Sequence, residues 1–339
     1  MNTKVYVLLF LLFAFSTFIF ASSTTDHFRS NGTGTWSTIG IWESSSDNLN
    51  WSAATLSPTS AANTITIRNG NTVSIGGAVS IDQTVIENGG QLNVSSGITL
   101  TIANVTGTDL TVNGILRNNA GTITTTGSVV FGSTGIFQLN HTTTAGVIPT
   151  ATWNSGSTCE IVGYTTNTSA PTNLGQSFSN FTFNCPNLSA NFSAGGALTT
   201  VNGNLTVAST GTGSFRLKGN GGVTVAIGGD LIITGGTFNI SSGNSTLDMN
   251  LSGNFTMSGG TLTESGGGTN NINFAGTTAQ IISITNSPTI NNTINFVVNS
   301  SAIAEFENEN TVLGGSTGTF TASSGSTLII KHASGITSS

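Results

Sequence analysis

Large apolar side chains fall at every second position in short segments along most of the chain. The clearest segments are 201–207, 227–233 and 251–257, which repeat one apolar–polar register. Alternation of this kind is the period of a β-strand and not of a helix. Two inner positions follow from the register, and their occupants are Leu205, Leu231 and Phe255 at the first, and Val207, Ile233 and Met257 at the second.

Turn signals separate these segments, as at Gly235-Gly236 and Gly259-Gly260. A unit of about 25 residues cannot bury its apolar face alone, so the units must stack on one another. The pattern therefore predicts an all-β fold, a right-handed parallel β-helix (β-solenoid) over residues 63–331. At about 24 residues per turn, or rung, this makes roughly eleven rungs and about 50 Å of stack. Residues 141–176, which hold Pro149 and Pro171, are less regular.

Both ends of the chain differ from this pattern. Residues 1–21 begin with Lys4, continue as an apolar run and end at Ala21, which is typical of a cleaved export signal. An uncleaved N-terminal anchor is the alternative reading. After cleavage we expect a secreted or cell-surface protein with no membrane span. Residues 332–339 supply neither a capping unit nor a second domain, so we expect the chain to continue into domains missing here.

Residues 22–62 are predicted to form an N-terminal cap. Three of the four tryptophans lie here, at Trp36, Trp42 and Trp51. Large aromatic side chains can cover the open apolar end of a first rung. The alternative is a platform on which sugar rings stack.

Composition narrows the choice of function. Charged residues make up 6% of the chain, against roughly 25% in an ordinary soluble domain. The 13 acidic and 7 basic residues give a net charge of −6. So few lysines and arginines provide no cationic track for a phosphate backbone, so nucleic-acid binding is not expected.

The two cysteines, Cys159 and Cys185, are separated by close to one repeat. That spacing favours similar positions on neighbouring rungs, about 4.8 Å apart along the axis. In an exported protein we therefore predict a disulfide between adjacent rungs. Two buried free thiols are the alternative.

No catalytic or metal-binding constellation is evident. Glycoside hydrolysis needs two carboxylates that flank one bond, but Asp230 and Asp248 are separated by less than one repeat and are out of register with it. Asp230 takes the place of Asn204 and Asn254 in the other copies, which indicates a turn residue that bonds local amides. The histidines have no partners at ligand spacing; they are His27, His141 and His332. We therefore predict no enzyme activity and no cofactor.

Paired threonines resemble the repeats of ice-binding solenoids, which need such a pair on one face of nearly every rung. In the sequence these pairs do not recur in register, and they lie at 64/66, 99/101 and 124/126.

Six segments carry a more specific resemblance, at 32–36, 42–43, 50–51, 65–73, 159–165 and 178–185. With the repeats that follow, they resemble large secreted β-solenoid surface proteins of Bacteroidota, which are adhesin-like. Many such proteins end in a type IX secretion sorting domain, which is absent here. The resemblance implies an adhesive or structural scaffold whose partners are surface polysaccharides or other cell-surface components. The alternative is a carbohydrate-active or carbohydrate-binding β-helix.

Overall fold

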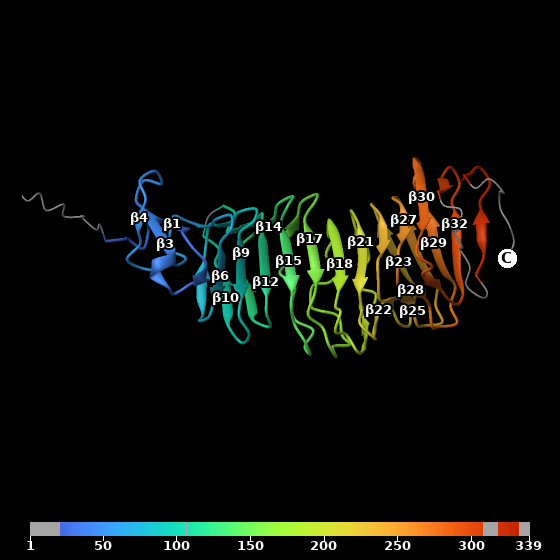
Figure 1. The fold of residues 1–339 in the computed structure, drawn as a ribbon, viewed down its shortest axis with the longest axis horizontal. Helices are drawn as coiled ribbons and strands as arrows, with labels where there is room; N and C mark the ends of the chain where they lie inside the picture. Colours follow the sequence, from blue (N-terminus) through green and yellow to red (C-terminus); the bar gives the residue numbers. More distant parts are fainter. Residues whose placement is uncertain (1–20, 106, 308–317, 332–339) are drawn as a thin grey trace, which may run out of the picture.

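The computed structural model describes residues 21–105, 107–307 and 318–331, and these form one elongated parallel β-solenoid (Figure 1). The predicted fold class is confirmed. The predicted export signal lies almost wholly outside the described residues, as do residues 332–339 and His332.

One sheet runs the whole length of the solenoid, and we call it the long sheet. All its pairings are parallel. Its 13 strands are β2 (Gly34–Thr35), β6 (Thr72–Ile75), β9 (Gln91–Val94), β12 (Ile115–Asn118), β15 (Ile136–Leu139), β17 (Thr158–Ile161), β18 (Asn180–Asn184), β21 (Leu205–Ser209), β24 (Leu231–Ile233), β27 (Phe255–Met257), β30 (Ala279–Ile284), β33 (Ile303–Phe306) and β35 (Thr327–Ile330).

Two further sheets complete the N-terminal rungs. The eight-stranded sheet contains β1 (His27–Ser30), β3 (Trp42–Ser45), β4 (Ser52–Ala53), β5 (Thr64–Ile67), β8 (Thr84–Ile86), β11 (Leu110–Val112), β14 (Val129–Phe131) and β16 (Thr152–Trp153). The three-stranded sheet contains β7 (Val79–Ile81), β10 (Thr99–Ile102) and β13 (Thr122–Thr125).

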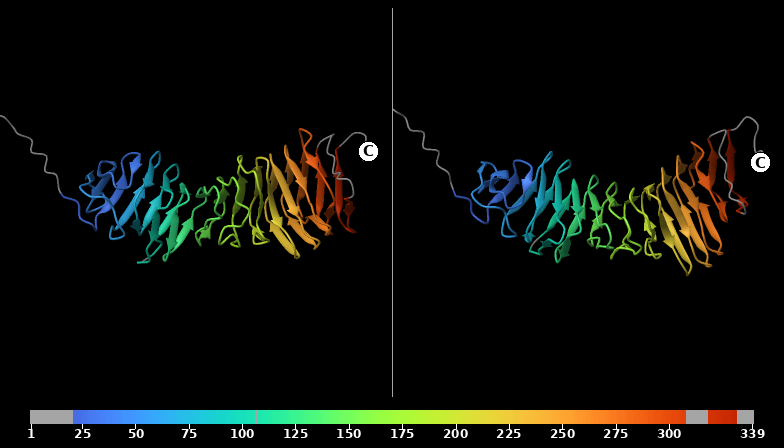
Figure 2. Two further views of the ribbon diagram at one scale, coloured as in Figure 1. Left: turned by 90° about the horizontal axis from the view of Figure 1, so that it is seen from below. Right: turned by 60° about the horizontal axis from the view of Figure 1, so that its bottom comes forward.

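Two different sheets take their place in the C-terminal rungs. The five-stranded sheet contains β19 (Asn191–Ser193), β22 (Ser214–Lys218), β25 (Thr237–Ser241), β28 (Thr261–Thr263) and β31 (Thr289–Ile290). The six-stranded sheet contains β20 (Thr200–Val201), β23 (Val223–Ile227), β26 (Leu247–Leu251), β29 (Asn270–Phe274), β32 (Ile294–Val298) and β34 (Phe320–Ala322). We call the place where the second pair of sheets replaces the first the exchange of sheets. Among the described residues the long sheet is the only sheet that continues through it. The stack is bowed along its length (Figure 2).

Equivalent positions of successive sequence repeats are register partners in the long sheet. Leu205 is paired with Leu231 and Leu231 with Phe255, and none of the three is exposed. The second inner column, formed by Val207, Ile233 and Met257, is equally buried. Side chains one residue away point to the opposite face, because successive residues of a strand alternate between faces.

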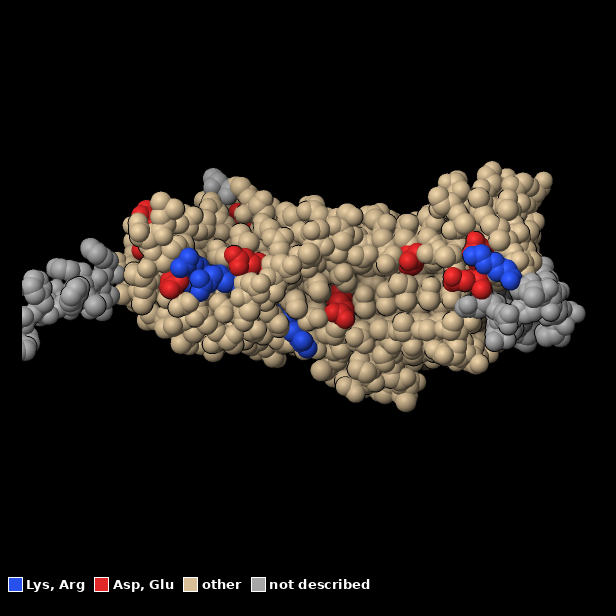
Figure 3. All heavy atoms as spheres, turned by 45° about the horizontal axis from the view of Figure 1, so that its top comes forward, with Lys and Arg blue, Asp and Glu red and all other residues tan. Residues whose placement is uncertain are grey.

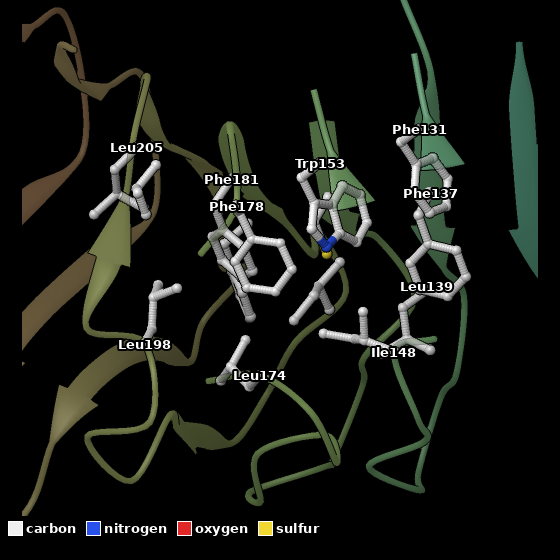
Figure 4. Close-up of a cluster of buried hydrophobic side chains, with 14 of the residues drawn as sticks. Phe131, Phe137, Leu139, Ile148, Trp153, Leu174, Phe178, Phe181, Leu198 and Leu205 are labelled. Atoms are coloured by element: carbon white, nitrogen blue, oxygen red, sulfur yellow. The ribbon is translucent and has the colours of Figure 1, made fainter. Parts of the chain in front are cut away.

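Aromatic side chains carry the core across the exchange of sheets (Figure 4). Phe131 stacks on Trp153 with ring centroids 4.2 Å apart and planes 3° apart. The edge of Trp153 meets Phe178 at 5.1 Å, and Phe178 meets Phe181 at 5.5 Å. The core thus stays continuous where the eight-stranded sheet ends.

Gln176 takes the place of a strand at this point. Its Oε1 accepts from the Ala151 amide at 2.9 Å and from Trp153 Nε1 at 3.2 Å. Its Nε2 donates to the carbonyls of Pro149 and Asn173 at 3.1 and 3.0 Å. One side-chain amide thus satisfies backbone groups that a neighbouring strand would otherwise pair.

The N-terminal segment is a small antiparallel sheet added to the first rung. β1 pairs antiparallel with β3 and parallel with β5. Trp36 and Trp42 are 3% and 1% exposed, and their ring centroids lie 5.0 Å apart. Trp51 stands apart from them, with the Arg29 guanidinium carbon 4.1 Å from its ring centroid. Two tryptophans therefore close the core, and the third packs outside beneath a cation.

Candidate functional site

The outer surface of the solenoid carries few charges. On the face drawn in Figure 3 the charged side chains are sparse and gather mainly toward the two ends. Near the N-terminus Glu43 accepts from Arg29 Nε at 2.7 Å and lies 3.8 Å from Arg68 Nη1. Near the C-terminus Lys331 pairs with Glu305. The lysine and arginine side chains described at both ends are therefore paired with acids.

The long sheet presents a polar outer column. Arg117, Gln138 and Glu160 are register partners on consecutive rungs. Arg117 Nη1 donates to Gln138 Oε1 at 3.4 Å, and Gln138 Nε2 donates to Glu160 Oε2 at 2.9 Å. The column continues with neutral side chains, namely Thr182, Thr206, Ile232, Thr256 and Ser283.

A ladder of asparagines and one aspartate lies at the N-terminal ends of consecutive strands of the long sheet. Asn180 Oδ1 accepts from the Asn204 amide at 2.9 Å, and Asn204 Oδ1 accepts from the Asp230 amide at 2.8 Å. Asp230 Oδ1 accepts from the Asn254 amide at 2.6 Å, and Asn254 Oδ1 from the Ile281 amide at 2.8 Å. The prediction that Asp230 bonds local amides is therefore wrong, because its partner belongs to the next rung.

The six-stranded sheet carries a second set of stacked amides. Asn271 Nδ2 donates to Asp248 Oδ1 at 2.7 Å, and Asn295 Nδ2 donates to Asn271 Oδ1 at 3.0 Å. Asp248 therefore lies on a different sheet from Asp230, and each carboxylate is engaged in its own ladder. The two acids do not flank one bond, as glycoside hydrolysis would require.

Threonines stack on the three-stranded sheet over two rungs. Thr99 pairs with Thr122 and Thr101 with Thr124. The expectation that these pairs do not recur in register is thus corrected for this sheet, since 122/124 and not 124/126 is the matching pair. Thr64 and Thr66 belong to the eight-stranded sheet, so the array does not extend to every rung.

A hollow of about 370 Å³ opens where the eight-stranded sheet ends. Its lining is neutral and consists of Trp153, Ser155, Gly156, Ser179, Asn180, Asn202 and Gly203. Trp153 is 9% exposed and packs on Phe131 and Phe178. Its indole is committed to the core, so the hollow offers hydroxyl and amide groups and no free aromatic face.

The two cysteines are free and fully buried, so the predicted disulfide is wrong and the alternative of two buried thiols holds. The register partner of Cys159 is Phe181 and not Cys185. The rung between them is therefore shorter than the repeat of residues 201–257. Cys185 lies four residues further along the chain, an offset of about 13 Å along an extended strand. Burial raises the pKa of Cys159 well above its ordinary value and that of Cys185 to about 12.

Within the described ranges no group of three or more His, Cys, Asp and Glu side chains could hold a metal ion. His27 Nδ1 bonds Thr64 Oγ1 at 2.8 Å, and His141 Nδ1 bonds Thr144 Oγ1 at 3.0 Å. His141 is 5% exposed, and burial lowers its pKa. These histidines are parts of local packing.

One buried acid pair was missed by sequence reasoning. Asp82 and Asp109 are 2% and 1% exposed and lie before β8 and β11, which pair with each other. Burial, followed by the hydrogen bond with Asp109, raises the pKa of Asp82. Burial also acts to raise the pKa of Asp109, but hydrogen bonds from the amide and hydroxyl of Ser128 act against it, and the net shift is downward. In the register of β8 and β11, Asp109 falls opposite the residue that follows Asp82, so alignment of the rungs brings the two acids within one position of each other, which no local motif does.

No known protein family, curated protein or solved structure matches the chain. Among the described residues, no helix has the length and apolar character needed to cross a membrane.

Proposed function

We propose that the chain is a rigid scaffold of an exported adhesive surface protein, without catalysis of its own. The observation that carries this proposal is the long sheet, which continues through 13 strands. At about 4.8 Å per strand it extends about 58 Å. A continuous sheet over a continuous core suits a stalk that holds its length under load.

The outer faces suit weak and repeated contacts. Columns of Asn, Thr and Ser offer hydrogen-bond donors and acceptors on consecutive rungs, as in Asn271 and Asn295 on the six-stranded sheet. Each such contact is weak, but many copies attached to one surface bind together with far higher avidity. Surface polysaccharides, rich in hydroxyl groups, are the partner class that these faces fit.

Export is supported by the composition of residues 1–21 and by the resemblance to secreted surface proteins. The absence of catalysis is supported by the placement of Asp230 and Asp248, whose carboxylates hold neighbouring rungs on two different sheets. A carbohydrate-binding β-helix is the second candidate, and the neutral hollow beside Asn180 and Asn202 favours it.

The test compares single and multivalent presentation. Residues 22–339 are offered to pectins, alginates and β-glucans either as free protein or at high density on beads. We expect the beads to be retained, the free protein to be retained weakly, and no reducing ends or unsaturated products above a boiled control.

Two variants test the alternative that the chain is an enzyme. Asp230→Asn keeps the ladder, because Asn204 and Asn254 occupy the equivalent positions, and Asp248→Asn does the same on its own sheet. Product release that either variant abolishes would overturn the scaffold proposal. Failure of the beads to bind any polysaccharide would overturn the adhesive part.

A further inference from the structure

The five-stranded sheet carries the only two basic residues between Arg117 and Lys331. Both are on β22, where Phe215 and Leu217 point into the core and Arg216 and Lys218 point outward. Side chains two apart on a strand share a face, at a spacing of about 6.6 Å. Two cations thus stand together on one outer face.

Lys218 is held in place by glycines. Its Nζ donates to the Gly195 carbonyl at 3.0 Å. A Cβ on Gly196 would lie 2.5 Å from Lys218 Cδ and 2.8 Å from Nζ, so the lysine stem lies directly against the turn. Gly196 has a φ of +80°, which glycine adopts without strain. The ammonium group is therefore positioned before any ligand arrives.

Arg216 has polar neighbours with unused bonding capacity. Its register partners are Ser193 and Asn239. Asn239 is 5% exposed; its Nδ2 donates to Ser265 Oγ at 2.8 Å, while its Oδ1 has no hydrogen-bond partner among the described residues. The buried Nε of Arg216 likewise lacks one among those residues. Arg216 thus lies beside a buried polar atom, Asn239 Oδ1, that like its own Nε has no hydrogen-bond partner among the described residues.

No described acid pairs with either cation. Arg29, Arg68 and Lys331 each form an ion pair, and Arg117 is linked to Glu160 through Gln138. The acid on the same side of the solenoid is Glu264, which follows Thr263 in the column of Arg216.

The carboxylate of Glu264 is buried and hydrogen-bonded to backbone amides. The residue is 4% exposed, and its carboxylate accepts from the amides of Gly266 and Thr293 at 2.7 and 3.3 Å. It is two rungs away from Arg216, about 10 Å along the axis. Its charge therefore does not neutralise the basic pair.

We propose that Arg216 and Lys218 form an anion-binding subsite for carboxylate or sulfate groups of an acidic polysaccharide. The inference rests on the adhesive scaffold proposed above and names its ligand class. A polysaccharide fits because hydroxyl side chains form a column beside the pair, at Thr237, Thr261 and Thr289. The cations would bind the anionic groups while the column bonds sugar hydroxyls.

The experiment uses matched polymers that share one backbone, namely dextran, dextran sulfate and carboxymethyl-dextran. Residues 22–339 are passed over each polymer at about 0.1 M salt, where the Debye length is about 10 Å. Because residues 22–339 keep all 13 acidic residues and, without Lys4, only six of the seven basic ones, general attraction to a polyanion is absent and retention reports a local site. We expect clear retention on either anionic polymer, or on both, and on dextran no more than the weak retention of the free protein on neutral polysaccharides.

Variants assign the retention to the basic pair. Arg216→Gln combined with Lys218→Gln should weaken binding about tenfold to a hundredfold, as loss of two charge-assisted contacts implies. Arg117→Gln is the matched control, since it removes one outward cation from the long sheet, and it should bind as the parent does. Arg216→Lys combined with Lys218→Arg keeps both charges and should retain binding, and an unchanged far-UV circular dichroism spectrum shows that the double glutamine variant is folded.

Equal retention on dextran and on both anionic polymers would overturn the inference, as would equal losses for the Arg117 control and the basic pair. Retention on the sulfated polymer alone, or on the carboxylated one alone, would support the inference and identify the anion. Bead capture by neutral polysaccharides without retention on either anionic dextran would reject this subsite and leave the scaffold proposal intact.

Discussion

Phe215 is the most connected ring of the described core, and its removal offers the sharpest test of the packing. It is fully buried on β22 and stacks on Phe183 of the long sheet, with centroids 4.6 Å apart and planes 4° apart. It also meets Phe238 at 5.4 Å and Phe192 at 5.8 Å within its own sheet. The ring thus joins two sheets and three rungs.

Truncation of this ring should be costly. A buried Phe→Ala change removes the transfer free energy of the ring and leaves a cavity, at about 3–5 kcal/mol. We expect Phe215→Ala to lie near the upper end, about 4–5 kcal/mol, because close aromatic pairs add about 0.5–1.5 kcal/mol each beyond burial. Phe215→Leu keeps most of the apolar volume and should cost about 1–2 kcal/mol.

Urea unfolding of residues 22–339, followed by far-UV circular dichroism, measures both losses. Phe320→Ala is the control, since Phe320 is 37% exposed, and it should cost less than about 1 kcal/mol. A loss below about 1 kcal/mol for Phe215→Ala, with an unchanged denaturant slope, would show that the ring does not bridge the sheets as described.

Three further outcomes are expected. Leu231→Asp should destabilise the stack by several kcal/mol, since it buries an unpaired carboxylate; a melting temperature within a degree or two of the parent would refute the register. Cys159 and Cys185 should resist alkylation until the chain unfolds, and a cross-linked peptide in non-reducing maps would contradict free thiols. Because the pKa of Asp82 is raised, the folded state retains a proton that the unfolded chain releases, so this group's contribution to the free energy of unfolding falls as pH rises from about 3.9 through the folded-state pKa. Asp82→Asn should flatten that part of the pH profile, and an unchanged profile would argue against the raised pKa.

The fold class was predictable because the strand period and the repeat agree. Leu205, Leu231 and Phe255 occupy one column, as their equal places in the repeats imply. The exchange of sheets was not predictable, since the Gly-Asn-Leu motif marks only the long sheet. The positions of the other sheets depend on loop lengths that vary from rung to rung. No local sequence pattern indicates these lengths.

Variation in rung length also explains the error at the cysteines. The repeat read from residues 201–257 does not hold at Cys159, where the rung is shorter and Phe181 is the register partner. A difference of four residues moves a side chain by about 13 Å along a strand. Contacts between rungs are therefore less predictable from spacing than is the inward or outward orientation of a side chain.

The exchange of sheets places different outer faces before and after the junction of one continuous solenoid. Before the junction the outer column of the eight-stranded sheet holds threonine and valine, as at Thr111 and Val130, while the long sheet holds the linked Arg117 and Gln138. After it the faces hold stacked amides and the unneutralised pair Arg216 and Lys218. The junction itself is spanned by the long sheet, the aromatic row and Gln176, so the change of surface occurs without a break in the core. A solenoid built in this way can carry different outer faces along its length on one continuous core, and the anion subsite proposed above lies on the C-terminal side of the junction.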